Sequence, residues 1–404
     1  MTRVGLRALS PTERVHARKE AYIGYAVHAV GRLNPDALTT AYEAVRDAYP
    51  QLAARLEADD DGPVFAESGA RQQVRFCDGD VEQPLTGVEL NQLRSLSALN
   101  VVYDGDEASV CLALHHSIAD AQHAIEVLVA LWSCYTDVVN GVPLDLPSHP
   151  YPRSLEDLLA ERGIHAHAPG AARTPMPLPS QAMSPPARVV RHVVQHRLTA
   201  AQTTALVERA HREHVTINGL LSGTILLAEA EIRGLPLSDL VYRYAVNLRQ
   251  HLSPPVGATE GTNVLGGVGF RVTDGIEPDA VSIGRAIGEQ LRAGLTDGSI
   301  QRSLLDIFHK PAPGARPWDP HLTPAVVSMM NWGVVPPIRP PDGLRLTNLR
   351  SASYTREAVA LGGYVVSTFD GRLGIDLAWP EGDPELPRRI DCLREQLGRV
   401  TSDL

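Results

Sequence analysis

The segment LALHHSIADAQH, residues 112–123, decides how this chain is interpreted, because it places two histidines and an aspartate where a strand gives way to a helix. The apolar run at residues 109–114 is typical of a buried strand, and residues 119–139 carry the pattern of a helix. Side chains alternate along a strand, so His115 and His116 should point to opposite faces of a sheet.

Asp120 lies four residues after His116, at the expected start of the helix, where free N–H groups favour a carboxylate. Residue by residue, two core histidines and an aspartate at a helix start would explain the segment. Imidazoles on opposite faces cannot bind one metal ion from a regular strand, and the helical HExxH pattern is absent, so we expect no metal. The complete HHxxxD pattern directly after an apolar strand favours a functional site over a coincidence.

Length and composition restrict the class of protein. The 404 residues allow two or three domains, and a net charge of −10 argues against a nucleic-acid partner. Four widely spaced cysteines favour a reducing compartment. The N-terminal residues lack the apolar run of a signal peptide, and no stretch has the length of a membrane span. We therefore expect a cytoplasmic protein without a membrane span.

The order of predicted elements indicates two lobes that each mix strands and helices. In the first half, a capping box formed by Ser10 and Glu13 predicts a helix that begins at Pro11. Further strands are expected at residues 22–30, 64–66, 74–77, 98–103 and 109–116, and helices at residues 35–48 and 119–139. A proline-rich stretch within residues 165–188 is expected to link the lobes.

The second half repeats this mixture. Thr199 and Gln202 form a second capping pattern, and glycine follows a predicted helix at residues 218–232. The other predicted helices pass through residues 283–291 and 390–397, and strands are expected at residues 189–196, 325–334, 363–369 and 373–379. We therefore predict an α/β fold with mixed sheets: a first lobe at residues 1–170, a linker at 171–188 and a second lobe at 189–404, with the ligand site between the lobes.

Three smaller features have ordinary explanations. His211 and His214 are spaced to lie together on a helix, but a solvated helix face explains them better than zinc. The glycine cluster at residues 266–270 is expected to be a bend in a strand rather than a phosphate-binding loop. The proline-rich residues 309–320 are expected to form a loop.

The HHxxxD pattern resembles the signature of the chloramphenicol-acetyltransferase-like superfamily, which includes nonribosomal-peptide condensation domains. Within it, the chain is most similar to the polyketide-associated acyltransferases of the phthiocerol dimycocerosyl transferase type. The resemblance is carried, in order along nearly the whole chain, by the segments LSPTERV, HHSIADAQHAIEVLVALWSCYTD, VTINGLLSGTILLAEAEIRG, YAVNLRQHLSPPVGATEGTNVLGG, VSMMNWGVV and VVSTFDGRLGIDLAW. It implies two lobes of the chloramphenicol-acetyltransferase type with an active-site tunnel between them.

The resemblance also implies roles for four residues. His116 would be the general base, His115 a packing residue, and Asp120 a structural residue paired with Arg249 of the NLR segment. Asn263 could line the cleft, and Ser328 and Asn331 could donate hydrogen bonds to an oxyanion; roles in turns or at strand ends explain these three equally well or better.

Two positions depart from the family pattern. Ala121 stands where glycine usually follows the aspartate, and Asn247 stands where an aspartate commonly precedes Leu-Arg. The first change adds a methyl group beside the expected base, and the second removes a charged partner.

The function implied by the resemblance is O-acyl transfer from acyl-CoA, or from a phosphopantetheine thioester on an acyl carrier protein, to a hydroxyl of a polyketide-like natural product, as in antibiotic biosynthesis. No permanently bound cofactor is expected, and the protein is expected to be a monomer. Two alternatives remain open at this point: an amide-forming enzyme of the condensation type, and a non-catalytic scaffold that binds carrier proteins.

Overall fold

The computed structural model describes residues 5–60, 62–68, 74–167, 189–190, 192–307, 325–355, 362–379 and 382–402. The expected linker at residues 171–188 and the expected loop at residues 309–320 lie outside these ranges. The described chain forms a mixed α/β fold with two six-stranded sheets and a three-stranded sheet. The predicted fold class is therefore confirmed.

The first large sheet has the strand order β5-β6-β7-β2-β13-β8. Its strands are β2 (Tyr22–Val30), β5 (Arg75–Asp78), β6 (Ser97–Asp104), β7 (Glu107–His115), β8 (Val189–Val190) and β13 (Arg345–Thr355). Helices α2 (Pro35–Ala48) and α3 (Ala121–Val139) pack with one another, and their apolar side chains share one core with the strands β2, β6 and β7.

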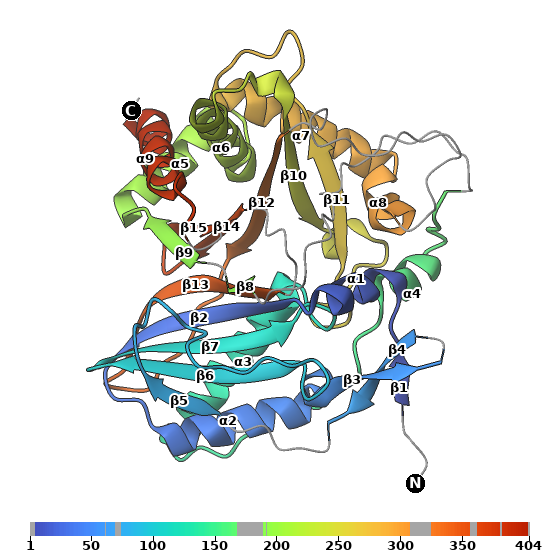
Figure 1. The fold of residues 1–404 in the computed structure, drawn as a ribbon, viewed down its shortest axis with the longest axis vertical. Helices are drawn as coiled ribbons and strands as arrows, with labels where there is room; N and C mark the ends of the chain where they lie inside the picture. Colours follow the sequence, from blue (N-terminus) through green and yellow to red (C-terminus); the bar gives the residue numbers. More distant parts are fainter. Residues whose placement is uncertain are drawn as a thin grey trace.

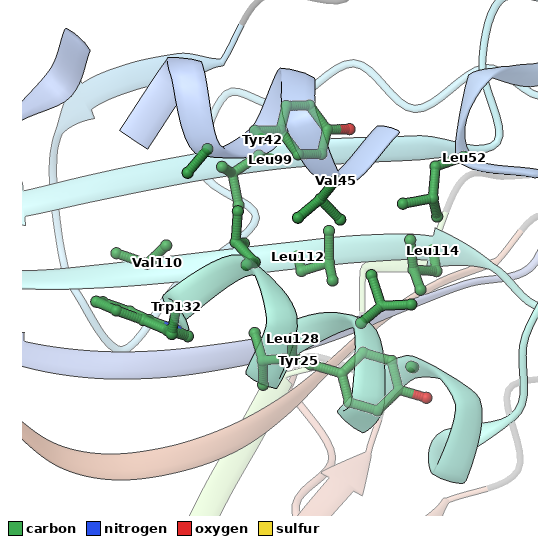
Figure 2. Close-up of a cluster of buried hydrophobic side chains, with 14 of the residues drawn as sticks. Tyr25, Tyr42, Val45, Leu52, Leu99, Val110, Leu112, Leu114, Leu128 and Trp132 are labelled. Atoms are coloured by element: carbon green, nitrogen blue, oxygen red, sulfur yellow. The ribbon is translucent and has the colours of Figure 1, made fainter. Parts of the chain in front are cut away.

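The alternation predicted for β7 is present. Leu112 and Leu114 point into the core shared with α2 and α3, where they lie near Leu128 and Tyr42 (Figure 2). Cys111 and Ala113 instead belong to a second cluster on the opposite face of the sheet, together with Tyr22 of β2, and three alanines, one tyrosine and two leucines complete it. Both faces of this strand are buried, which explains why its sequence is apolar without interruption.

The second large sheet has the strand order β11-β10-β12-β14-β15-β9. Its strands are β9 (His192–Arg197), β10 (Leu240–Asn247), β11 (Leu265–Phe270), β12 (Ala325–Val334), β14 (Gly363–Phe369) and β15 (Arg372–Trp379). The helices α5 (Ala200–Arg212), α6 (Ile217–Arg233), α7 (Ala280–Thr296) and α9 (Leu386–Ser402) lie above this sheet in the upper lobe of Figure 1. Apolar residues from these helices and strands form the core of that lobe.

Strand β13 joins the two halves of the chain. It follows β12 in sequence but pairs with β2 along its whole length and with β8 at its end, so it lies in the lower lobe of Figure 1. Its sequence, RLTNLRSASYT, mixes polar and apolar residues and gave no strand signal in the sequence. Strands β8 and β13, whose residues were predicted to belong to the second lobe, therefore complete the sheet of the first lobe.

The remaining elements surround the junction between the lobes. A small sheet has the order β1-β4-β3, formed by β1 (Gly5–Ala8), β3 (Ala54–Asp59) and β4 (Gly62–Glu67). Helix α1 (Pro11–Lys19) has the predicted capping box, and α4 (Leu155–Ala160) and α8 (Ser299–Ile307) complete the described helices apart from three short 3-10 turns. Those turns are η1 (Pro50–Ala53), η2 (Leu237–Asp239) and η3 (Arg249–His251).

Two smaller predictions were wrong. Helix α5 ends at Arg212, and His214 adopts the left-handed conformation beyond it with φ of 54°, so His211 and His214 do not share a helix face. Residues 266–270 form most of strand β11, paired with β10 along its length, rather than a bend.

No single helix in the described part of the chain is long and apolar enough to cross a membrane; α5 and α6 pass that test only as a pair, bent by 104°.

Candidate active site

His116 lies just beyond the end of β7, where the chain turns toward α3. Its backbone N–H donates to the carbonyl of Ala21 at 2.7 Å, and its ring Nδ1 lies 3.1 Å from the carbonyl oxygen of Ala119. The Nδ2 of Asn263 donates to the His116 carbonyl at 2.7 Å. Both the backbone and the ring are therefore fixed, while the side chain remains partly exposed.

These contacts determine which nitrogen of His116 is basic. A carbonyl oxygen can only accept, so Nδ1 must carry the hydrogen that it donates to Ala119. In the neutral ring, Nε2 then holds the free lone pair. Burial lowers the pKa of His116 below its ordinary value, and the Asp120 carboxylate opposes part of this effect. The neutral, proton-accepting form is therefore favoured.

A second imidazole that the sequence did not indicate lies against His116. The ring of His16, on helix α1, stacks on that of His116 with centroids 4.1 Å apart and an interplanar angle of 27°. Burial lowers the pKa of His16 well below its ordinary value, and the nearby His116 and His115 lower it further. A spacing of one hundred residues gives no signal in the sequence that could have paired these rings.

His115 has different surroundings from its neighbour. It is fully buried, its Nδ1 lies 2.7 Å from the Ser117 hydroxyl, and it accepts the Ser117 backbone N–H at 3.2 Å. Its ring meets the ring of Tyr22 edge to face at 4.8 Å. Burial lowers the pKa of His115 to about 3, with a further contribution from His116, so it is neutral at physiological pH. It packs on the face of β7 opposite to the main core, as predicted.

Asp120 caps helix α3 and pairs with Arg249. One carboxylate oxygen accepts the backbone N–H of His123 at 3.1 Å. The other accepts Nη1 of Arg249 at 2.7 Å and the backbone N–H of Val264 at 2.9 Å. Both charged side chains are almost completely buried, with 1% exposure for Asp120 and 3% for Arg249. The expected ion pair is present, and it joins the start of α3 to the segment after β10.

Asn247 takes part in this arrangement in place of the usual aspartate. Its Oδ1 accepts the backbone N–H of Arg249 at 3.1 Å and lies 3.3 Å from Nη1 of the same residue. The guanidinium also donates to the carbonyls of Ala258 and Gly261. An uncharged amide suffices here because Asp120 supplies the counter-charge.

Residues 258–264 bind the HHxxxD turn from the second half of the chain. The Asp120 N–H donates to the Thr262 carbonyl at 2.8 Å. The ring of His123 lies 3.0 Å from the Gly261 carbonyl through Nδ1 and 2.8 Å from the Gln51 amide through Nε2, and burial lowers its pKa to about 4. Sequence reasoning missed His123, because one buried histidine on a helix carries no distinctive pattern.

The three tentative cleft residues differ in position. Asn263 bonds to the His116 carbonyl, so it belongs to the site. Asn331 accepts the Gly333 N–H at 2.8 Å and donates to Asn218 at 3.0 Å, which is the strand-end role considered for it. Ser328 lies on β12 in the second sheet. In the described ranges, neither Asn331 nor Ser328 has a recorded contact with His116.

The site offers no arrangement typical of a metal. Among the described residues, no group of three or more His, Cys, Asp or Glu side chains could hold a metal ion. The geometry instead provides a partly exposed imidazole with a free lone pair, held by neutral and ion-paired groups. That arrangement can accept a proton from a substrate.

Comparison with known proteins identifies the family. The family described as "Phthiocerol/phthiodiolone dimycocerosyl transferase C-terminus" matches residues 187–378. The phthiocerol/phthiodiolone dimycocerosyl transferase of Mycobacterium ulcerans (strain Agy99) is 33% identical over 414 residues, covering 98% of this chain and 97% of the relative. The chain belongs to the phthiocerol/phthiodiolone dimycocerosyl transferase family. It is therefore an acyltransferase.

Solved structures agree with the architecture. Polyketide synthase associated protein 5 from Mycobacterium tuberculosis superposes with a TM-score of 0.82 at 28% identity, over the full length of both chains. The first condensation domain of the calcium-dependent antibiotic synthetase, in complex with a substrate analogue, has a TM-score of 0.68 at 16% identity, over 100% of this chain and 97% of that one. The second likeness concerns the fold alone.

Proposed function

We propose that this acyltransferase moves an acyl group from a thioester, on coenzyme A or on the phosphopantetheine arm of a carrier protein, to a hydroxyl of a polyketide-like product. The observation that carries the proposal is the orientation of His116. Its Nδ1–H is committed to Ala119, so Nε2 is the atom left to accept a proton. The names of the relatives support a polyketide-lipid acceptor.

In the proposed reaction, Nε2 of His116 removes the proton of the attacking hydroxyl. The hydroxyl oxygen forms a bond to the thioester carbonyl, and the resulting tetrahedral intermediate collapses with cleavage of the carbon–sulfur bond. The imidazolium returns its proton to the departing thiolate. A thioester is already activated, so the reaction needs no covalent acyl-enzyme and proceeds through a ternary complex.

The surrounding residues would hold this base in place. Asp120 and Arg249 fix the turn that carries His116, and Asn263 fixes its backbone carbonyl. His115 packs beneath it. The acyl donor and the acceptor are proposed to reach His116 through a tunnel between the lobes, from opposite sides. None of these roles requires a metal or a bound cofactor.

The decisive experiment measures thiol release from acyl-CoA substrates in the presence of alcohol acceptors. His116→Ala should lower kcat by about 10²–10⁴-fold, the usual contribution of a general base, while the protein still folds and binds donor. His115→Asn is the matched control, because it removes the adjacent imidazole from the opposite strand face. It should affect thermal stability more than kcat.

Other outcomes would redirect the assignment. Near wild-type turnover by His116→Ala would contradict the proposed mechanism. Transfer to amines but not to alcohols would indicate an amide-forming enzyme, and carrier-protein binding without any thiol release would indicate a scaffold. Parallel initial-rate lines, or an acylated protein detected by mass spectrometry, would indicate a covalent nucleophile.

A further inference from the structure

Arg243 on β10 is a partly buried arginine that forms no salt bridge with any carboxylate among the described residues. Within the part of the chain that the structure describes, its Nε atom is buried without a hydrogen-bond partner, and burial lowers its pKa with no acidic group opposing the effect. Four other buried or partly buried arginines each bond to a carboxylate: Arg7 to Glu13, Arg249 to Asp120, Arg350 to Glu82 and Arg389 to Glu229. A partly buried guanidinium without a counter-charge is costly, which makes Arg243 a candidate to bind an anionic ligand.

The strand register shows which way Arg243 faces. Asp376 of β15 is paired with Val365 of β14, and Val365 with Met330 of β12. Two residues earlier on β12, Ser328 is paired with Arg243. Paired residues in neighbouring strands share a face, as do residues two apart, so all five side chains lie on one face of the second sheet.

That face is turned toward the first lobe. The Asp376 carboxylate accepts the backbone N–H of Ser351 on β13, a strand of the first sheet. The residues on either side of Arg243, Tyr242 and Tyr244, point the other way into the core beneath the helices. Arg243 is therefore directed between the lobes, where the proposed function places the substrates.

The residues paired with Arg243 in the neighbouring strands have short side chains. Its partner on β11 is Gly269 and its partner on β12 is Ser328, so no side chain longer than a hydroxymethyl flanks it in the sheet. Arg243 also lies four residues before Asn247, which is about 13 Å along a strand. Asn247 bonds to the Arg249 that holds Asp120, so Arg243 is remote from the atoms around His116.

We propose that Arg243, with the hydroxyl of Ser328 beside it, binds an oxyanion at the end of a substrate remote from the bond that is formed. This inference rests on the proposed acyl transfer. A guanidinium binds phosphate and carboxylate groups through paired N–H donors. Two sources fit: the phosphate of a phosphopantetheine arm, whose thioester lies at the opposite end, or a carboxylate carried by the hydroxylated acceptor.

The test compares ligands with and without the anion by isothermal titration calorimetry at low salt, without turnover. The donor pair is 4′-phosphopantetheine and pantetheine; the acceptor pair is 12-hydroxydodecanoate and its methyl ester. In one pair, the anionic ligand should bind about tenfold or more tightly to wild type, and the pair that shows this preference identifies the source. Arg243→Gln should abolish the preference.

Two further variants complete the design. Arg372→Gln removes an exposed arginine from the same sheet and should retain the preference. Arg243→Lys keeps the charge but not the paired donors, so it should reduce the preference several-fold, and it serves if the glutamine variant does not fold. No preference in either pair with wild type, an unchanged preference in Arg243→Gln, or an equal loss in Arg372→Gln would overturn the proposal. Because no turnover is involved, an enzyme that failed to transfer acyl groups would contradict the proposed function without altering this measurement.

Discussion

The two large sheets meet at two polar junctions that are built differently. At the first, beside His116, both oxygens of the Asp120 carboxylate accept hydrogen bonds, and Arg249 provides a full counter-charge. At the second, between β13 and β15, one oxygen of Asp376 accepts the Ser351 N–H, while the other is buried and has no hydrogen-bond partner in the described ranges. Burial raises the pKa of Asp376, although its hydrogen bonds to Ser351 and the nearby Arg350 oppose this effect.

The difference shows what each junction requires of its carboxyl group. Asp120 is positioned by charge, since both oxygens of its carboxylate accept hydrogen bonds and a buried counter-charge faces it. That rigidity suits a turn that must hold His116 in one orientation. Asp376 is only partly satisfied, so its junction joins the lobes without depending on an ionised group. Removing the Asp120 carboxylate and removing the Asp376 carboxylate should therefore change the free energy of unfolding by different amounts and with a different dependence on pH.

The largest effect is expected at the first junction. Asp120→Ala should lower the free energy of unfolding by about 3–5 kcal/mol, because it strands the buried Arg249 charge. Urea denaturation measures this loss. Asp137→Ala is the matched control, since it breaks a more exposed pair with Arg339 and should cost only about 0–1 kcal/mol. Equal losses in the two variants would show that the active-site junction does not depend on its ion pair.

Replacing Asp376 at the second junction should change the free energy of unfolding less than replacing Asp120. The dependence of this change on pH should be opposite to that of a salt-bridged carboxylate. A carboxyl with a raised pKa in the folded state stabilises the protein below its ordinary pKa near 4, and this contribution is lost as pH rises through the raised value. Asp376→Asn cannot ionise, so its stability relative to wild type should increase with pH.

The measurement compares unfolding free energies of wild type and Asp376→Asn at pH 4.5 and pH 7.5. The stability difference between the two proteins is expected to move in favour of Asp376→Asn from pH 4.5 to pH 7.5, by an amount set by how far burial raises the pKa of Asp376. A difference that is constant with pH, or that moves in favour of wild type as pH rises, would mean that Asp376 is ionised and satisfied in the folded protein.

The sequence predicted the first junction because its parts lie in recognisable motifs. HHxxxD and NLR each occupy one short segment, and the pairing of Asp120 with Arg249 follows from the resemblance to the family. The alternation of β7 was likewise readable, since Leu112 and Leu114 lie two residues apart in a continuous apolar run. Local periodicity and motif spacing carry this kind of information.

The second junction could not be predicted in the same way. It depends on β13 leaving the second half of the chain to pair with β2, and neither strand indicates its partner. Asp376 lies in an apolar strand with no motif, and Arg243 appears unpaired only when the register of β10, β11 and β12 is known. For Asn331, the residue type suits an oxyanion site, but its bonds to Asn218 and Gly333 match the strand-end role that the sequence already favoured.

The smallest effect is expected at His16, the other unforeseen member of the first junction. Helix α1 is held there by Glu13, which accepts hydrogen bonds from Arg7 and from Thr262. The ring of His16 stacks on His116. Stacked aromatic pairs contribute about 0.5–1.5 kcal/mol, so His16→Ala should lower kcat/KM by about 2- to 12-fold.

His16→Phe distinguishes a stacking role from proton transfer. Phenylalanine keeps the flat ring against His116 but cannot carry a proton, so kcat/KM and its dependence on pH should stay close to those of wild type. The measurement is the pH profile of kcat/KM for wild type and both variants. If His16 itself accepted the substrate proton, both variants would lose as much activity as His116→Ala, and phenylalanine would restore nothing. In that case the Asp120–Arg249 ion pair would still hold the turn, but His16 and His116 would both take part in proton transfer.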